Sequence, residues 1–227
     1  MRRALRGLST VLIVAGALLV ADAGVTLAWQ EPVSALYARM TQNRLDGQLR
    51  ELERLGPTPL EARALAGLHG VRRRLGFLAR RLERRVRPGE ALGRISIPAV
   101  GARFVVVQGT GGADLRKGPG HYPATPLPGE RGTVAIAGHR TTYLAPFLRL
   151  DGIHAGDRVV LEMPYGRFTY AYERTRIVAP SATWVTRRVR YDRLVLTACH
   201  PLYSAAERIV VFARLVGAKP RGAVLAP

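Results

Sequence analysis

Cysteine and lysine are nearly missing from this 227-residue chain. Cys199 is the single cysteine, Lys117 and Lys219 are the only lysines, and arginine supplies the other 33 of the 35 basic residues. One cysteine excludes an internal disulfide and any metal site built from several thiolates. The sequence also contains no cluster of histidines and carboxylates at metal-ligand spacing and no glycine-rich phosphate loop. We therefore expect neither a metal nor a cofactor.

Acidic residues are also scarce. The chain has 16 of them against 35 basic residues, which gives a formal net charge of +19. Such a surplus favours acidic partners, such as anionic lipid head groups, cell-wall polymers or nucleic acid. No helix-turn-helix, zinc-finger or RNA-binding aromatic motif occurs in the sequence. Nucleic acid is therefore not an expected partner.

The first 29 residues have the pattern of a membrane anchor. Three arginines among the first six residues precede an almost uncharged segment, Leu8 to Ala28. About 20 apolar residues suffice to cross a bilayer, and flanking arginines stay in the cytoplasm. We interpret residues 1–29 as a cytoplasmic basic tail and a single transmembrane anchor. A cleaved signal peptide, with Ala21-Asp-Ala23 as its cleavage site, is the alternative, and both interpretations place the rest of the chain outside the membrane.

Residues 30–89 read as a basic helical stalk or linker. Leucines recur at helical spacing, and the pattern predicts two helices broken near Gly56-Pro57-Thr-Pro59. Arginine clusters at 72–74, 80–81 and 84–85 form either a solvated face or a surface for anionic lipid or a teichoic-type polymer. Docking of these helices on the following domain is a further possibility.

Short apolar runs separated by turn signals follow Pro88-Gly89. The expected strands are Leu92–Ile97, Arg103–Gln108, Val134–Ala137, Arg158–Met163, Arg167–Val178, Arg193–Ala198 and Arg208–Val216. Seven or eight strands of this kind predict a mainly β fold, a small closed or nearly closed barrel with short helices. We assign this domain to residues 90–217 and a short tail to residues 218–227.

Two candidate catalytic residues each follow an apolar run. Cys199 lies where the run from Leu194 gives way to a loop, and His139 follows the run Thr133–Gly138. The thiolate is the reactive form of cysteine, and a nearby imidazolium or guanidinium stabilises it. Cys199 and His139 could therefore meet at one rim of a sheet or barrel. The alternative is that Cys199 is a small buried apolar residue.

Taken in order, these motifs resemble the sortase family, most closely the class E-like sortases of high-GC Gram-positive bacteria. Ala137-Gly-His139-Arg matches the histidine motif, Leu196-Thr-Ala-Cys199-His-Pro the cysteine motif, and Arg208-Ile-Val-Val the arginine strand. The resemblance covers roughly residues 90 to 217. It implies the sortase β-barrel, in which neighbouring strands carry the cysteine and the arginine.

The resemblance also implies an activity, that of an extracytoplasmic cysteine transpeptidase. Cys199 would attack a Thr-Gly bond in a C-terminal sorting signal of the Leu-Ala-x-Thr-Gly or Leu-Pro-x-Thr-Gly type and form a thioester. Arg208 would stabilise the oxyanion, and His139 would move the protons. The implied partners are exported proteins with such signals and an amine acceptor in the cell wall or on a pilin. A hydrolytic cysteine peptidase and a catalytically impaired envelope-binding domain remain alternatives.

Three further residues are candidates for substrate binding. Ala198 precedes the nucleophile, where sortases usually carry threonine. Tyr143 follows His139 by four positions and is expected to shape the groove for the sorting signal. His121, in a Gly-Pro-Gly-His-Tyr-Pro loop, is expected to pack near the cleft and is the rival of His139 as proton carrier.

The other candidates for the catalytic histidine and arginine are weaker. His200 adjoins Cys199, but neighbouring strand residues point to opposite faces. Arg140 and Arg214 are the alternatives to Arg208 as the catalytic guanidinium.

Overall fold

The computed structural model describes residues 2–29 and 32–221 of the chain. The helices are α1 (Arg2–Trp29), α2 (Pro32–Leu55), α3 (Pro59–Ala66), α4 (Val71–Arg85) and α5 (Gly112–Leu115). The strands are β1 (Ala91–Ile97), β2 (Ala102–Gln108), β3 (Gly120–His121), β4 (Thr133–Ala137), β5 (Arg158–Met163), β6 (Gly166–Val178), β7 (Arg193–His200) and β8 (Glu207–Pro220). Short 3-10 turns lie at η1 (Pro98–Val100), η2 (Leu150–Gly152) and η3 (Thr183–Thr186).

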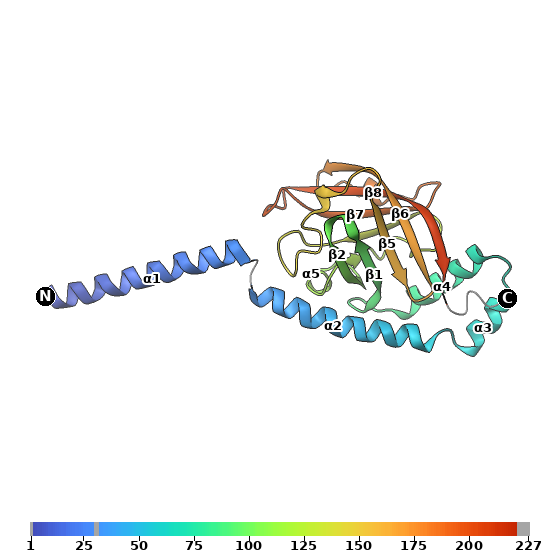
Figure 1. Ribbon diagram of the computed structural model, residues 1–227, viewed down its shortest axis with the longest axis horizontal. Helices are drawn as coiled ribbons and strands as arrows, with labels where there is room; N and C mark the ends of the chain where they lie inside the picture. Colours follow the sequence, from blue (N-terminus) through green and yellow to red (C-terminus); the bar gives the residue numbers. More distant parts are fainter. Residues whose placement is uncertain (1, 30–31, 222–227) are drawn as a thin grey trace.

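The strands close into a barrel in the order β1-β2-β3-β4-β7-β8-β6-β5 (Figure 1). Two neighbouring pairs, β2–β3 and β4–β7, are parallel, and the other pairs are antiparallel. The predicted mainly β barrel is confirmed, and each of the seven expected runs forms a strand. The additional strand, β3, has two residues and carries no apolar run that would reveal it in the sequence.

The barrel interior is the main hydrophobic core. Alternate residues of a strand face opposite sides, so Leu194, Leu196 and Ala198 of β7 point inward while Val195 points outward. This alternation decides which side chains of β7 reach the outer surface.

Helix α2 packs along the outside of the barrel. Its Leu45 and Leu49 lie against Val105 and Val107 of β2 in a small buried cluster. The side-chain amide of Gln42 adds hydrogen bonds to the same strand: Nε2 donates to Val105 O at 3.1 Å, and Val105 N donates to Oε1 at 2.7 Å. The segment predicted as a stalk therefore begins with a helix bound to the barrel wall.

Helix α4 closes one end of the barrel. Leu75, Ala79 and Leu82 are buried and belong to the main core. The expectation of two helices in this region is wrong, because the second splits into α3 and α4 between Ala66 and Val71. The leucine spacing continues across this gap, but Gly70 at the start of α4 has a φ of +89°, which interrupts the helix.

Helix α1 projects away from the barrel as a separate element (Figure 1). Among the residues that the structure describes, no helix combines the length and apolar character needed to cross a membrane. The side chains of residues 22 and 23, in the alternative cleavage site, lie outside the described part. Of the predicted tail, residues 218–220 extend β8, and residues 222–227 are outside the described residues.

Candidate active site

Three neighbouring strands bring Cys199, His139 and Arg208 to the same rim of the barrel. Strand β7 lies between β4 and β8. β4 runs parallel to β7 with Ala137 opposite Thr197, and His139 and Cys199 each follow this pair by two residues. On the other side of β7, Cys199 is the antiparallel pairing partner of Arg208. Directly paired residues have their Cα atoms about 4.5–5.5 Å apart and project to the same face of the sheet.

The face on which Cys199 lies follows from the alternation along β7. Ala198 points into the core, so Cys199 projects outward together with Thr197. Cys199 is a free, half-buried thiol. A half-buried thiol at a strand end is open to an incoming ligand while its backbone is held in the sheet.

His139 has the properties of a proton carrier. Burial lowers its pKa, and the positive charge of Arg116 lowers it further. Its Nε2 atom is buried and has no hydrogen-bond partner within the described residues. The ring lies 5.3 Å from that of Tyr143, and the Phe147 amide donates to the His139 carbonyl at 3.0 Å. A fixed imidazole with one unused nitrogen is suited to exchange a proton with a bound substrate.

Arg208 turns part of its guanidinium toward the loop before β8. Nη1 donates to the carbonyls of Ala205, at 2.9 Å, and Glu207, at 2.8 Å. These bonds fix the side chain, while Nε and Nη2 have no protein acceptor within the described part of the chain. The rival Arg214 lies six positions further along β8 and forms an ion pair with a glutamate of β6. Of the two, only Arg208 pairs with Cys199.

Arg140, the other rival, is buried and structural. Its side chain is 2% exposed and donates to Leu148 O at 3.3 Å and to Asp151 Oδ2 at 2.9 Å. Its Nη1 also lies 3.2 Å from Nδ1 of His200. Arg140 thus connects the loop that carries His139 with the strand end that carries Cys199. Its adjacency to His139 is the only sequence signal for this role.

The side chains of Ala198 and His121 lie away from the outer face. Ala198 is 4% exposed and packs inside the barrel. His121 is 1% exposed, with Nδ1 2.8 Å from Gln108 Oε1 and Nε2 near Thr125 Oγ1 and Pro126 O. Burial lowers the pKa of His121 to about 4, although the Pro126 carbonyl opposes this shift. Neither side chain is placed to contact a peptide at Cys199, whereas Tyr143 adjoins His139.

An outer apolar cluster continues from Cys199 along the barrel wall. Its buried members are Ala135, Val185, Val195, Val210 and Phe212. The ring of Trp184, in η3, stacks on Phe212 with centroids 6.2 Å apart and is 39% exposed. Beside Cys199, the hydroxyls of Tyr122 and Thr197 are 2.9 Å apart. Sequence reasoning missed Trp184, Tyr122 and Arg116, because nothing in their local sequence links them to the site.

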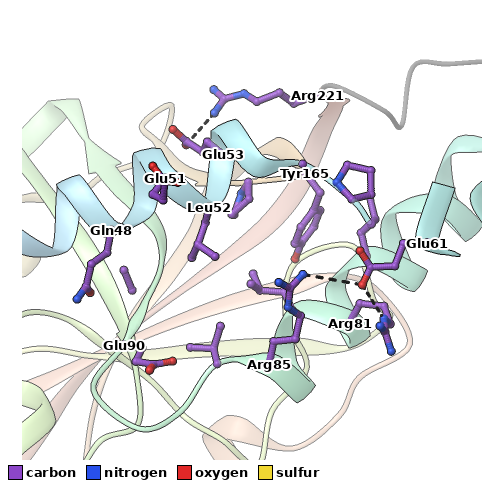
Figure 2. Close-up of a pocket in the computed structure, with 17 residues that line it drawn as sticks. Gln48, Glu51, Leu52, Glu53, Glu61, Arg81, Arg85, Glu90, Tyr165 and Arg221 are labelled. Atoms are coloured by element: carbon purple, nitrogen blue, oxygen red, sulfur yellow. Dashed lines mark hydrogen bonds and ion pairs between the residues drawn. The ribbon is translucent and has the colours of Figure 1, made fainter. Parts of the chain in front are cut away.

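A cavity of about 520 Å³ lies far from these residues, between α2, α3, α4 and the start of β1 (Figure 2). Its floor is apolar, and its rim carries charges that are paired with one another. Glu61 accepts from Arg81 at 2.9 Å, and Glu53 pairs with Arg221 at 3.0 Å. Among the residues that the structure describes, neither histidine nor cysteine lines it. This cavity therefore has no nucleophile-and-base arrangement comparable to that of Cys199 and His139.

Comparison with known proteins agrees with this geometry. A family model of the sortase domain matches residues 95–216. The chain is 35% identical over 132 residues to Sortase D of Bacillus subtilis (strain 168), an alignment that covers 56% of this chain and 65% of that protein. The chain thus spans slightly less than two thirds of that relative's length.

Two solved structures show the same fold. Sortase E from Streptomyces avermitilis is 30% identical, with a TM-score of 0.55, over 61% of this chain and 99% of that chain. The Sortase D5 transpeptidase of Clostridium perfringens has a TM-score of 0.63 at 20% identity, over 78% of this chain and 99% of that chain. The second likeness is one of fold alone.

Proposed function

Because the chain belongs to the sortase family, whose members are cysteine transpeptidases, we propose that it joins exported proteins to an amine by way of a thioester on Cys199. The bond cleaved is Thr-Gly in a C-terminal signal of the Leu-Ala-x-Thr-Gly or Leu-Pro-x-Thr-Gly type. The acceptor is an amine of the cell wall or of another protein. The observation that supports the proposal is the strand register: Cys199 pairs with Arg208, and β4, which ends two residues before His139, runs parallel to β7.

The first half of the reaction forms the thioester. The lowered pKa of His139 favours its neutral imidazole, which can accept the thiol proton of Cys199. The thiolate then attacks the threonine carbonyl. The donors of Arg208 that have no protein acceptor stabilise the resulting oxyanion, for which a permanently charged guanidinium is suited. The imidazolium of His139 returns its proton to the glycine amine, and the C–N bond breaks.

The second half transfers the acyl group. A new amine binds beside His139 and gives a proton to the neutral imidazole as it attacks the thioester. A second oxyanion forms and is stabilised by the same guanidinium. Collapse releases the amide product, and the thiolate recovers its proton from His139. Each proton that His139 accepts in one half of the reaction is given back within the same half, so the proton balance closes.

The outer apolar cluster supports a peptide groove next to Cys199. Val195 and Val210 are fully buried members of this cluster, and Trp184 is partly exposed above Phe212. The ring of Tyr143 lies 5.3 Å from that of His139. Apolar side chains suit the leucine and the alanine or proline at the start of the sorting signal, and the extended backbone of such a peptide reaches Cys199 with its threonine.

The test is peptide transfer by the purified full-length chain. Leu-Ala-x-Thr-Gly and Leu-Pro-x-Thr-Gly peptides are incubated with a glycine amine, and mass spectrometry follows both the thioester and the ligated product. Cys199→Ala abolishes both, and Arg208→Gln lowers kcat/KM by at least about 100-fold. His154→Ala and Arg176→Gln, at exposed positions, are the matched controls and keep full activity.

The ratio of ligated product to free acid distinguishes transpeptidation from hydrolysis. Release of free acid that added amine does not suppress would identify a hydrolytic peptidase. A folded chain that forms no thioester with either peptide would contradict the proposal.

The same proposal includes export and anchoring by residues 1–29, with the N-terminus in the cytoplasm and the barrel outside. Supporting it, α1 is one 28-residue helix, and its large apolar side chains from Leu8 to Val20 are exposed. Carbonate extraction and protease accessibility in spheroplasts test this. An anchored protein stays in the membrane pellet and is cleaved from outside, whereas a cleaved signal peptide yields a shortened protein in the supernatant.

A further inference from the structure

A second cavity, of about 760 Å³, lies between α4 and the loops that precede β4 and β7. Five arginines line it, and we call it the arginine groove. They are Arg72, Arg73 and Arg80 of α4, Arg131 of the loop before β4, and Arg188 of the loop before β7. Three chain segments, distant in sequence, therefore contribute arginines to the lining of one cavity.

The positive charges of the arginine groove are only partly balanced. Arg72 pairs with Asp192 at 2.7 Å, and Arg80 lies 3.5 Å from Glu130. The other three arginines of the groove form no ion pair within the described residues. Five guanidinium groups thus face two carboxylates. The cavity of Figure 2 differs in this respect, because its arginines Arg81 and Arg221 are paired with glutamates.

Close packing holds this arrangement in place. Gly76 of α4 faces Gly129, and a Cβ atom built on Gly76 would lie 3.3 Å from the Gly129 carbonyl and 3.5 Å from Nη1 of Arg80. Gly129 has a φ of +104°. These two glycines let the helix approach the loop closely, which keeps the guanidinium groups on α4 near those on the loops.

We infer that the arginine groove binds a soluble polymer that carries repeated phosphate groups, such as a phosphodiester chain. The guanidinium fork matches the oxygens of a phosphate and donates two parallel hydrogen bonds to it. Unpaired arginines on three segments, around a space of this volume, suit several phosphates better than a single anion.

The position of the groove favours a polymer in solution over lipid head groups. In Figure 1, α1 and α4 lie at opposite ends of the molecule, separated along α2. Helix α2 has 24 residues and is therefore about 36 Å long. An anchor in α1 would place the groove well away from the bilayer surface.

The groove also lies at the opposite end of the barrel from Cys199. Thr133, which lines it, begins β4, and Arg188 precedes Arg193 at the start of β7. Cys199 is near the other end of β7, about 20 Å from Arg193. A polymer held in the groove would leave the thiol accessible, so the groove could keep the protein on an envelope polymer while the thiol reacts.

The test compares two full-length variants of equal net charge. The groove variant is Arg73→Gln/Arg131→Gln/Arg188→Gln. The control variant is Arg103→Gln/Arg158→Gln/Arg176→Gln, which removes three exposed arginines that neither line the groove nor form ion pairs within the described residues. Binding of inorganic polyphosphate is measured by titration calorimetry in 0.15 M salt, about the physiological ionic strength. Thermal melting confirms that both variants are folded.

The groove variant is expected to bind polyphosphate at least about tenfold more weakly than the unmodified chain, while the control variant stays within about twofold. Orthophosphate at the same phosphate concentration competes poorly. Equal losses in the two variants would show diffuse attraction to the net charge and overturn the inference, and so would full competition by orthophosphate.

A second arm uses vesicles of phosphatidylglycerol. The groove variant and the control variant, which have equal net charge, are expected to bind them alike, because the groove contributes nothing to vesicle binding. A loss confined to the groove variant would assign the site to lipid head groups and reject the soluble polymer. Neither arm measures peptide transfer, so the result is independent of the catalytic proposal.

Discussion

The proposed chemistry is most sensitive to the surroundings of His139. Burial and the charge of Arg116 both disfavour the imidazolium, so both lower the pKa of His139. A neutral imidazole accepts the thiol proton, but the protonated form is required to release the glycine amine. The pH dependence of transfer therefore reports on the imidazole of His139.

Replacing Arg116 tests this dependence. Arg116→Gln removes a positive charge near the ring, so the protonated form becomes less unfavourable and the pKa of His139 rises. The acidic limb of the kcat/KM profile moves to higher pH, with a change of less than about tenfold at the optimum because Arg116 is exposed. NMR titration of the imidazole checks the direction. An unchanged titration, or one equally shifted in Arg103→Gln, would contradict the electrostatic role.

His121 is expected to set part of the acid stability of the fold. Its pKa is about 4 in the folded chain, against 6.5 for a free histidine. Between these values the unfolded chain binds a proton that the folded chain does not, so stability falls as pH decreases from 6.5 to 4. The full shift corresponds to about 3 kcal/mol, and the loss ends below pH 4. Urea unfolding from pH 4 to 7 measures it, and His121→Gln should flatten the slope by that amount.

At the scale of single elements, Gln42 is one of the residues that attach α2 to the barrel. Its amide donates to the carbonyls of Val105, at 3.1 Å, and Lys117, at 2.7 Å, and accepts from the Val105 amide at 2.7 Å. One side chain thus satisfies three backbone groups at the wall of the barrel. Removing the Gln42 side chain leaves these three backbone groups without this partner, partly buried beneath the helix.

Gln42→Ala is therefore expected to lower the free energy of unfolding by about 2–3 kcal/mol, the cost of leaving buried backbone groups without partners. The matched control is Gln48→Ala, six positions along the same helix, where the side chain is exposed. Denaturant titration of both variants gives the comparison. Similar losses in the two would mean that α2 contributes through its apolar face alone.

The elements themselves were largely predictable from local pattern. Each expected apolar run became a strand because alternating residues of β-branched and aliphatic type need one buried face. The gap between α3 and α4 was not predicted, because Leu65 and Leu75 keep helical spacing across it. Two-residue strand β3 was missed for a related reason: it is defined by its neighbours and not by its own residues.

The candidate site was predictable only in part. Cys199 and His139 stand at strand ends, which a single sequence reveals, whereas the choice of Arg208 came from the resemblance to a family. Its pairing with Cys199 depends on the register between β7 and β8, which is a tertiary property. The inward direction of Ala198 follows from the same register, and the contacts of Arg140 depend on a loop whose path cannot be read from its residues.

At the scale of the whole molecule, the helices and the barrel share their cores. Leu75 and Leu82 of α4 belong to the main core, and Leu45 and Leu49 of α2 complete the smaller one. Arg94 of β1, with a side chain only 13% exposed, also forms ion pairs with two acidic residues of α2. The boundary expected near residue 90 therefore separates segments that pack together.

We accordingly predict that a chain beginning at residue 34 folds, whereas one beginning at residue 90 does not remain a stable monomer. Removing α2–α4 exposes the apolar surface against which four buried leucines pack, at about 1.5–3 kcal/mol for each. That loss of about 6–12 kcal/mol is comparable with the whole stability of a typical domain. Arg94 would also lose both of its ion-pair partners.

Size-exclusion chromatography and thermal melting of the two fragments test whether each is a stable monomer. If the shorter fragment were monomeric and melted within a few degrees of the longer one, the barrel would be an independent folding unit and the helices only an attachment.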